Sequence, residues 1–122
     1  MTEFTVDFIV KEPDESLWRM VLVEEGPWPS KDTESNLRRI QERLYHCVDV
    51  ALDGGLWRLF PDSYGKLVVV QLDCYNVPEH DVREFFERFS AGALSAPNYA
   101  AALKNTPYLS GLSFELNCAT AG

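Results

Sequence analysis

Few residues in this chain of 122 have the types and spacing that could carry out chemistry. Cys74, His80 and Asp81 resemble a catalytic group, because nucleophilic catalysis needs a nucleophile, a base and a residue that orients the base. Cys74, however, stands in an alternating apolar run, where a thiol is expected to be buried and inert. We therefore expect this cysteine to serve packing, and we expect that the protein is not an enzyme.

The two histidines, His46 and His80, do not predict a metal site. His46 adjoins Cys47, but neighbouring positions on a helix point about 100° apart and do not ligate one ion together. His80 and Cys74 could approach each other across a turn, yet a structural zinc site needs four ligands. The sequence also has no G-x-G-x-x-G, P-loop or G-x-S-x-G motif. We expect neither a metal nor a cofactor.

Acidic side chains are more informative than the histidines. The net charge is −8, and residues 1–34 hold nine acidic and three basic residues. This balance disfavours nucleic acids and anionic membranes and favours a basic protein partner, although ordinary solubility explains it equally well. One acidic group lies in an expected hairpin and the next loop, and a second lies on an expected helix. The candidate partner-binding acids are Glu12, Asp14, Glu15, Glu24, Glu25, Glu79, Asp81, Glu84 and Glu87.

Trp28 stands between two prolines in the segment GPWPSKD, and its ring has two interpretations. It could be an anchor for a partner, which adds Trp28 to the candidate partner-binding residues. It could instead be a lid that joins the start of the following helix to the sheet. The flanking prolines hold the loop stiffly, so we favour the lid.

Apolar alternation predicts four strands that position these side chains. Residues 4–10 and 112–118 alternate, while residues 17–25 and 66–75 are apolar runs of strand length. The first strand would place Phe4, Val6, Phe8 and Val10 on one face. The inward residues of the last two strands would be Val68, Val70, Leu72, Cys74, Leu112, Phe114, Leu116 and Cys118.

Helical spacing predicts a long helix from Asp32 or Thr33 to Gly54, where glycine supplies a left-handed cap. A second helix follows Pro78 and ends at Gly92, and a short one covers residues 96–105. The expected buried stripes are Leu37, Ile40, Leu44, Cys47, Val48 and Ala51, then Val82, Phe85, Phe86 and Phe89. Residues 56–65 are expected to be a loop whose Leu56, Trp57, Leu59, Phe60 and Tyr64 fill the bottom of the core.

The order β-β-α-β-α-(α)-β predicts one α+β domain over residues 1–122. We expect a two-layer sandwich with a four-stranded, largely antiparallel sheet and helices on one face. Leu67, Val69 and Tyr75 make the other face too apolar to be left simply in water. A homodimer through that face is therefore an alternative function, in which the chain is a self-associating accessory module.

The cysteines and the first residues bear on the compartment. Cys47, Cys74 and Cys118 are odd in number and lack C-x-x-C spacing, and the start MTEFTVDFIV does not resemble a signal peptide. No apolar run approaches the ~20 residues of a membrane span. We expect a cytoplasmic protein with reduced thiols.

Several short motifs together resemble a family of small bacterial proteins of unknown function. They are VDFIV, PW, the helix with Leu37, Gln41 and Leu44, GGLW…FPDSYGKLVVVQLDCY, and Pro78 before an acidic helix. The resemblance covers roughly residues 6–90 and departs around APNYAAALKNTPY. It implies a fold and provides no catalytic residues.

Size, charge and expected fold are also similar to those of immunity proteins from bacterial toxin systems, including contact-dependent growth inhibition. Many such toxins are nucleases with basic clefts, which an acidic protein can occupy without chemistry of its own. The sequence therefore predicts a bacterial immunity protein that neutralises a basic toxin domain by direct binding.

Overall fold

In the part of the chain that the structure describes, the sheet contains four strands in the order β1-β2-β3-β4, and it is mixed rather than largely antiparallel. The computed structural model describes residues 6–12 and 16–119. β1 (Phe8–Lys11) pairs antiparallel with β2 (Leu17–Glu25). β3 (Lys66–Tyr75) is parallel to β2 on one side and to β4 (Leu109–Ala119) on the other.

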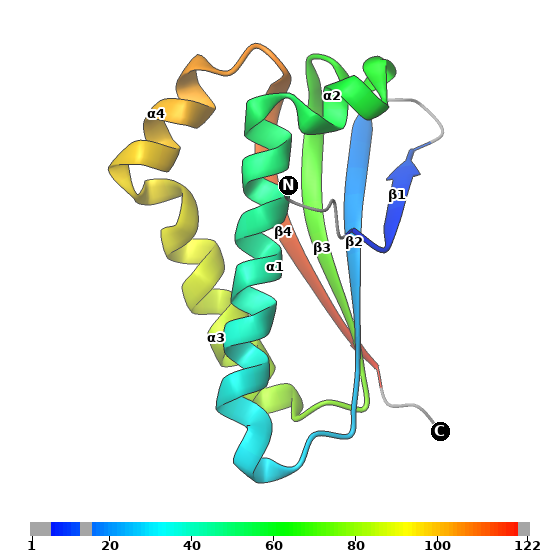
Figure 1. The fold of residues 1–122 in the computed structure, drawn as a ribbon, viewed down its shortest axis with the longest axis vertical. Helices are drawn as coiled ribbons and strands as arrows, with labels where there is room; N and C mark the ends of the chain where they lie inside the picture. The colour runs from blue at the N-terminus through cyan, green and yellow to red at the C-terminus, as the bar shows by residue number, and fades with distance from the viewer. Residues whose placement is uncertain (1–5, 13–15, 120–122) are drawn as a thin grey trace.

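The two long helices explain why the expected antiparallel sheet is wrong. α1 (Thr33–Asp53) connects β2 to β3, and α3 (Glu79–Gly92) connects β3 to β4. A connection of this length returns the chain to the end at which the previous strand began, so the next strand runs parallel. Both crossovers step the same way along the sheet, and right-handed crossovers then place both helices on one face (Figure 1).

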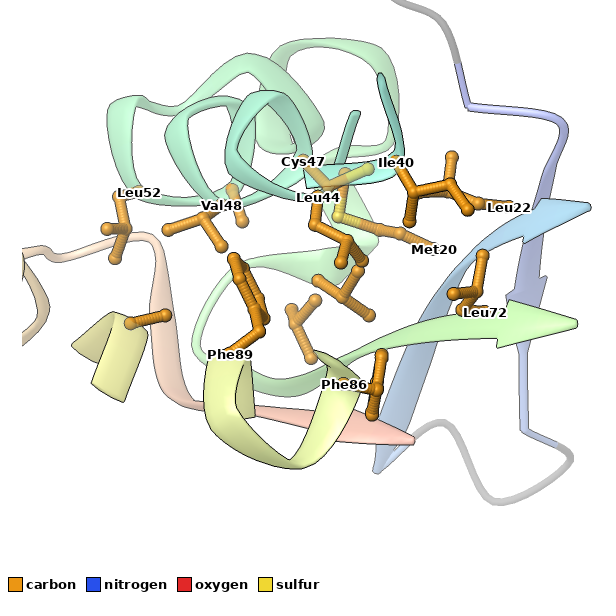
Figure 2. Close-up of a cluster of buried hydrophobic side chains, with 14 of the residues drawn as sticks. Met20, Leu22, Ile40, Leu44, Cys47, Val48, Leu52, Leu72, Phe86 and Phe89 are labelled. Carbon is orange, nitrogen blue, oxygen red and sulfur yellow. The ribbon is translucent and has the colours of Figure 1, made fainter. Parts of the chain in front are cut away.

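The core lies between this helical layer and the sheet. Side chains from β2, α1, β3 and α3 meet there, as Figure 2 shows. The inward faces predicted for the strands β3 and β4 are confirmed, because all the residues on those faces belong to the core or pack against it. α1 also ends as predicted, with Gly54 in the left-handed region at φ 93°. The most completely buried side chains include Met20, Leu22, Ile40, Leu44, Val48, Val70, Leu72 and Val82.

Residues 56–65 are not the loop that the sequence suggested. They contain α2 (Gly55–Leu59) and a 3-10 turn (Pro61–Ser63), and α4 (Pro97–Asn105) precedes β4. Leu56 and Phe60 contribute to the core, but Trp57, Leu59 and Tyr64 are exposed. The expectation that these three residues fill the core is therefore wrong. Trp57 instead stacks on Tyr108, with 5.4 Å between ring centroids.

β1 faces the opposite way from the simplest interpretation of its alternation. Its register pairs Ile9 with Met20, so Ile9 packs against the core. Phe8 and Val10 consequently lie on the open face of the sheet, and they are 59% and 42% exposed. Phe4 lies outside the described residues. Two of the four residues expected on one apolar face, Phe8 and Val10, are thus exposed, because the pairing with β2 decides which face is covered, whereas Val6 packs against the core.

Candidate protein-binding surface

Glu24 was expected on an exposed acidic surface, and the structure corrects this. It lies on the helix-covered face of β2 and is only 4% exposed. Arg39 of α1 donates two hydrogen bonds to its carboxylate, at 2.6 and 2.7 Å, and Arg43 donates a third at 2.6 Å. A carboxylate held in this way is not available to a partner.

Asp7 extends the same ionic cluster toward the first strand. Its carboxylate accepts hydrogen bonds from the Val23 amide at 2.7 Å and from Arg43 at 2.9 Å. Burial by itself would raise the pKa of Glu24, but the bonds from Arg39 and Arg43 outweigh it and hold that pKa below its usual value. The cluster fastens β2 and the preceding segment to α1, so its role is structural.

Glu12 belongs to a different network, on the open face of the sheet. Arg19 donates hydrogen bonds to Glu12 and to Gln71, both at 2.9 Å, and it also contacts Glu115 of β4. Glu25 is exposed, and Asp14 and Glu15 lie outside the described residues. The hairpin acids that the structure describes are thus divided between two faces and do not form one surface.

The open sheet face is apolar around this network. Leu67 and Tyr75 of β3 are 50% and 40% exposed, and the exposed Phe8 and Val10 lie on β1, at the end of the strand order. Val69, by contrast, is only 8% exposed, although the sequence suggested that it was open to a partner. Exposed apolar groups therefore surround the Arg19 network without forming an uninterrupted apolar centre.

The four acids of α3 are all exposed, in contrast to Glu24. Glu84 pairs with Arg88 at 2.6 Å, and Glu79 approaches Arg83 at 3.6 Å, both one turn apart on the helix. Acids near a helix N-terminus also stabilise the helix by interacting with its dipole, which is their purely structural role. Whether these acids could also bind a partner depends on the surface beside them.

A groove runs between α1 and α3, which lie next to each other in the helical layer (Figure 1). Its first part, of about 560 Å³, begins where both helices start, and its second part, of about 440 Å³, lies further along them. Phe85 and Arg88 line both parts, so the two are continuous. The other lining residues are Ser30, Thr33, Glu34, Leu37, Gln41, Tyr45, Asp81, Glu84, Phe89, Gly92 and Ala93.

The chemistry of the groove changes across its width. Leu37, Tyr45 and Phe85 are half-buried and contribute to an apolar floor, and Tyr45 meets Phe89 edge-on at 5.0 Å. The rim of the first part carries the carboxylates of Glu34, Asp81 and Glu84 and one guanidinium, that of Arg88. The rim is therefore acidic overall, and the floor is apolar.

Sequence reasoning found the acids of α3 but missed the groove. The available signal was the pair Phe85 and Phe86, since adjacent residues on a helix point in directions about 100° apart. Phe86 faces the core and is 5% exposed, whereas Phe85 is only half-buried and faces the groove. An apolar stripe that is wider than the core requires is a sign of a second surface.

Trp28 lies at the end of the molecule where α1 and α3 begin. It is half-buried and packs against the core. The loop that carries it is held by the Gly26 amide, which bonds to the Tyr75 carbonyl at 2.8 Å. A Cβ atom on Gly26 would lie 1.8 Å from the Asn76 carbonyl oxygen, so this close approach requires glycine. This environment is the one expected of a lid on the core.

A second cleft, of about 540 Å³, lies beside α2 and is lined by His46, Asp49, Asp53 and Arg58 among others. Its acids already have partners within the protein. Asp49 accepts a hydrogen bond from Tyr99 at 2.8 Å, and Asp53 accepts one from the Gly55 amide at 2.9 Å. Glu34 and Glu84 of the groove are also paired, with Arg38 and Arg88. We favour the groove because it combines its acids with an apolar floor that includes Leu37, Tyr45 and Phe85.

The cysteine considered for catalysis is buried. Cys74 is 1% exposed, and burial raises the pKa of its thiol to about 12, so it is not a thiolate at neutral pH. His80 is exposed on α3, and its Nε2 lies 3.6 Å from the Glu84 carboxylate. Within residues 6–12 and 16–119, no three or more Cys, His, Asp or Glu side chains gather as metal ligands. In the same segments, no helix combines the length and apolarity that crossing a membrane requires.

The fold and the groove define an α+β protein with one helical layer, one open sheet face and an acidic groove between its two long helices. Comparison of the chain with protein-family models, with curated proteins and with solved structures found no match. Any statement about function therefore depends on the groove itself.

Proposed function

We propose that this chain is an immunity-type protein, which neutralises a bacterial toxin by binding a basic segment of it in the groove between α1 and α3. The observation that carries the proposal is the combination of an apolar floor with an acidic rim. This combination suits an amphipathic basic segment, whose apolar residues would contact Leu37 and Phe85. Its lysines and arginines would meet Glu34, Asp81 and Glu84.

Charge and contact make different contributions to such binding. Acids on an exposed rim increase the association rate by electrostatic steering, and they contribute less to the lifetime of the complex. Apolar residues that become fully buried mainly slow dissociation. Glu79 and Glu87 lie on α3 outside the groove lining, so their contribution would be to long-range steering. Glu24 is not part of this surface, because Arg39 and Arg43 already engage it.

The test is a double charge reversal, Asp81→Lys with Glu84→Lys. A tagged protein purified at low salt should retain a basic partner, and that partner should arrest growth when it is produced without this chain. The double variant should associate with the partner at least about tenfold more slowly at low salt, and it should fail to restore growth.

The matched control is Glu42→Lys with Asp62→Lys, which changes the net charge equally at two exposed positions outside the groove. Steering by the groove predicts that this control slows association much less than the groove variant. Equal slowing by the two variants would contradict the groove, and a partner that does not arrest growth would contradict the immunity role. Phe85→Ala should leave the association rate nearly unchanged and accelerate dissociation.

A further inference from the structure

β4 is a long strand with a neighbour on one side. It contains eleven residues, and it occupies one end of the sheet order with β3 beside it. The Ala119 carbonyl accepts a hydrogen bond from the Asn76 amide, immediately after β3, at 3.0 Å. Because successive residues of a strand direct their backbone groups to opposite sides, the even-numbered residues direct theirs away from β3. These residues are Leu112, Phe114, Leu116 and Cys118.

The outward backbone groups of β4 are left open. In the described part of the chain, no hydrogen bond joins the outward amides and carbonyls of residues 112–118 to another segment. Natural sheets normally protect such an edge with lysine, proline, a bulge or a short strand. Residues 111–118 contain no lysine, arginine or proline, and their one charged residue, Glu115, is paired with Arg19. The register shift of this pairing lies before residue 111, so it does not protect this stretch.

The side chains of this edge are also incompletely covered. Leu112, Phe114 and Leu116 pack against the core but are only half-buried. The corresponding residues of β3, such as Val70 and Leu72, are 0% exposed. Another strand beside β4 would cover the same row of side chains and satisfy the open backbone groups at once.

We propose that a second copy of this chain supplies that strand, with the two β4 strands antiparallel about a two-fold axis at Phe114. The sequence of β4 is self-complementary in this register. Phe114 faces its own copy, and Leu112 faces Leu116. On the open face, Ser113 faces Glu115, so a hydroxyl can donate a hydrogen bond to a carboxylate. Gly111 faces Asn117, and no like charges meet.

The resulting dimer has a continuous eight-stranded sheet. Its two-fold axis is perpendicular to the sheet, so both helical layers lie on the same side and both open faces on the other. The interface is formed by β4 and leaves the Ser30 end of the groove, where the acids cluster, outside the strand pairing.

The test uses two opposite charges at one exposed position, Ser113. Ser113→Glu places two glutamates directly opposite each other at both symmetric positions, whereas Ser113→Lys places a lysine opposite each Glu115. Sedimentation equilibrium should show a dimer that Ser113→Glu weakens about tenfold and that Ser113→Lys retains or strengthens. Thermal unfolding at low concentration checks that both variants fold as well as the original protein.

A second measurement examines the backbone itself. Hydrogen exchange at the amides of Leu112, Phe114 and Leu116 should slow as concentration rises, because pairing protects the outward groups. A monomer at all concentrations up to about 1 mM would overturn the proposal. So would equal weakening by both Ser113 variants, which contradicts the register. A dimer that dissociates on Leu67→Lys but not on Ser113→Glu would place the interface on the open sheet face instead.

Discussion

Glu24 and the acids of α3 carry the same charge in opposite environments. Glu24 is buried between β2 and α1 and receives three hydrogen bonds from two arginines. Glu79, Asp81, Glu84 and Glu87 are exposed to water, where ion pairs with neighbouring arginines contribute little stability. The difference teaches that net charge does not measure the charge available to a partner. In this protein, part of the acidic excess fastens the fold, and a separate part lines the groove.

Removal of the buried charge should have the largest effect. Glu24→Gln leaves Arg39 and Arg43 without their counter-charge, and breaking such a pair typically costs about 3 kcal/mol or more of unfolding free energy. The adjacent Glu25 is exposed, so Glu25→Gln should change that free energy by less than about 0.5 kcal/mol. Urea unfolding of both variants measures the difference. Similar midpoints for the two variants would show that the ionic cluster contributes little.

Lowering the pH should also reveal the contribution of the buried cluster, with a smaller effect on the free energy of unfolding than Glu24→Gln has. The pKa values of Glu24 and Asp7 are lowered from ordinary values of 4.5 and 3.8, despite the opposing effect of burial. As the pH falls, the two carboxylates therefore bind protons at a higher pH in the unfolded chain than in the folded protein. Their contribution to stability is complete above the unfolded pKa values and is lost as the pH falls through the lower pKa values of the folded protein.

The free energy of unfolding should fall more steeply below about pH 4.5 in the original protein than in the double variant Asp7→Asn with Glu24→Gln. Chemical unfolding at a series of pH values measures both slopes. If the slopes were the same, other carboxylates would be responsible for acid unfolding, and the cluster would not be.

The smallest stability effect is expected on α3. Glu84 forms an exposed pair with Arg88, and pairs of this kind contribute about 0.3–0.5 kcal/mol. Glu84→Gln should lower the unfolding free energy by no more than this amount while slowing association with a basic partner. Thermal unfolding beside binding kinetics separates the two effects. A loss above about 1 kcal/mol would mean that these acids, like Glu24, are primarily structural.

The local pattern predicted the elements better than it predicted their arrangement. The bounds of β3 and the start and end of α1 follow from apolar spacing and from the glycine at Gly54, and the structure confirms them. Pairing direction is a long-range property, so alternation could not provide it. The length of the two helical connections is the sequence feature that indicates parallel strands. Phe8 and Val10 were misplaced because register with β2 determines their face.

The candidate binding surface was also hard to predict, because it too depends on contacts between elements that are distant in the sequence. β2 is apolar on both sides in its middle, so its sequence did not determine which face Glu24 occupies. The informative residues were on another element, since Arg39 and Arg43 are one helical turn apart and point toward the same strand. The groove needs two helices that are remote in sequence, and its floor was visible in the sequence as the adjacent pair Phe85 and Phe86.

The position of β3 has a consequence for synthesis of the chain. β3 is flanked by β2 and by β4, and β4 leaves the ribosome after the other three strands described here. Until then, a nascent chain that has already formed α1 and α3 presents the whole length of β3 as an open edge beside Val68, Val70 and Leu72. Such an edge readily pairs with other chains. A translation product that ends before Leu109 is therefore expected to aggregate, and its recovery would depend on chaperones that bind exposed apolar strands.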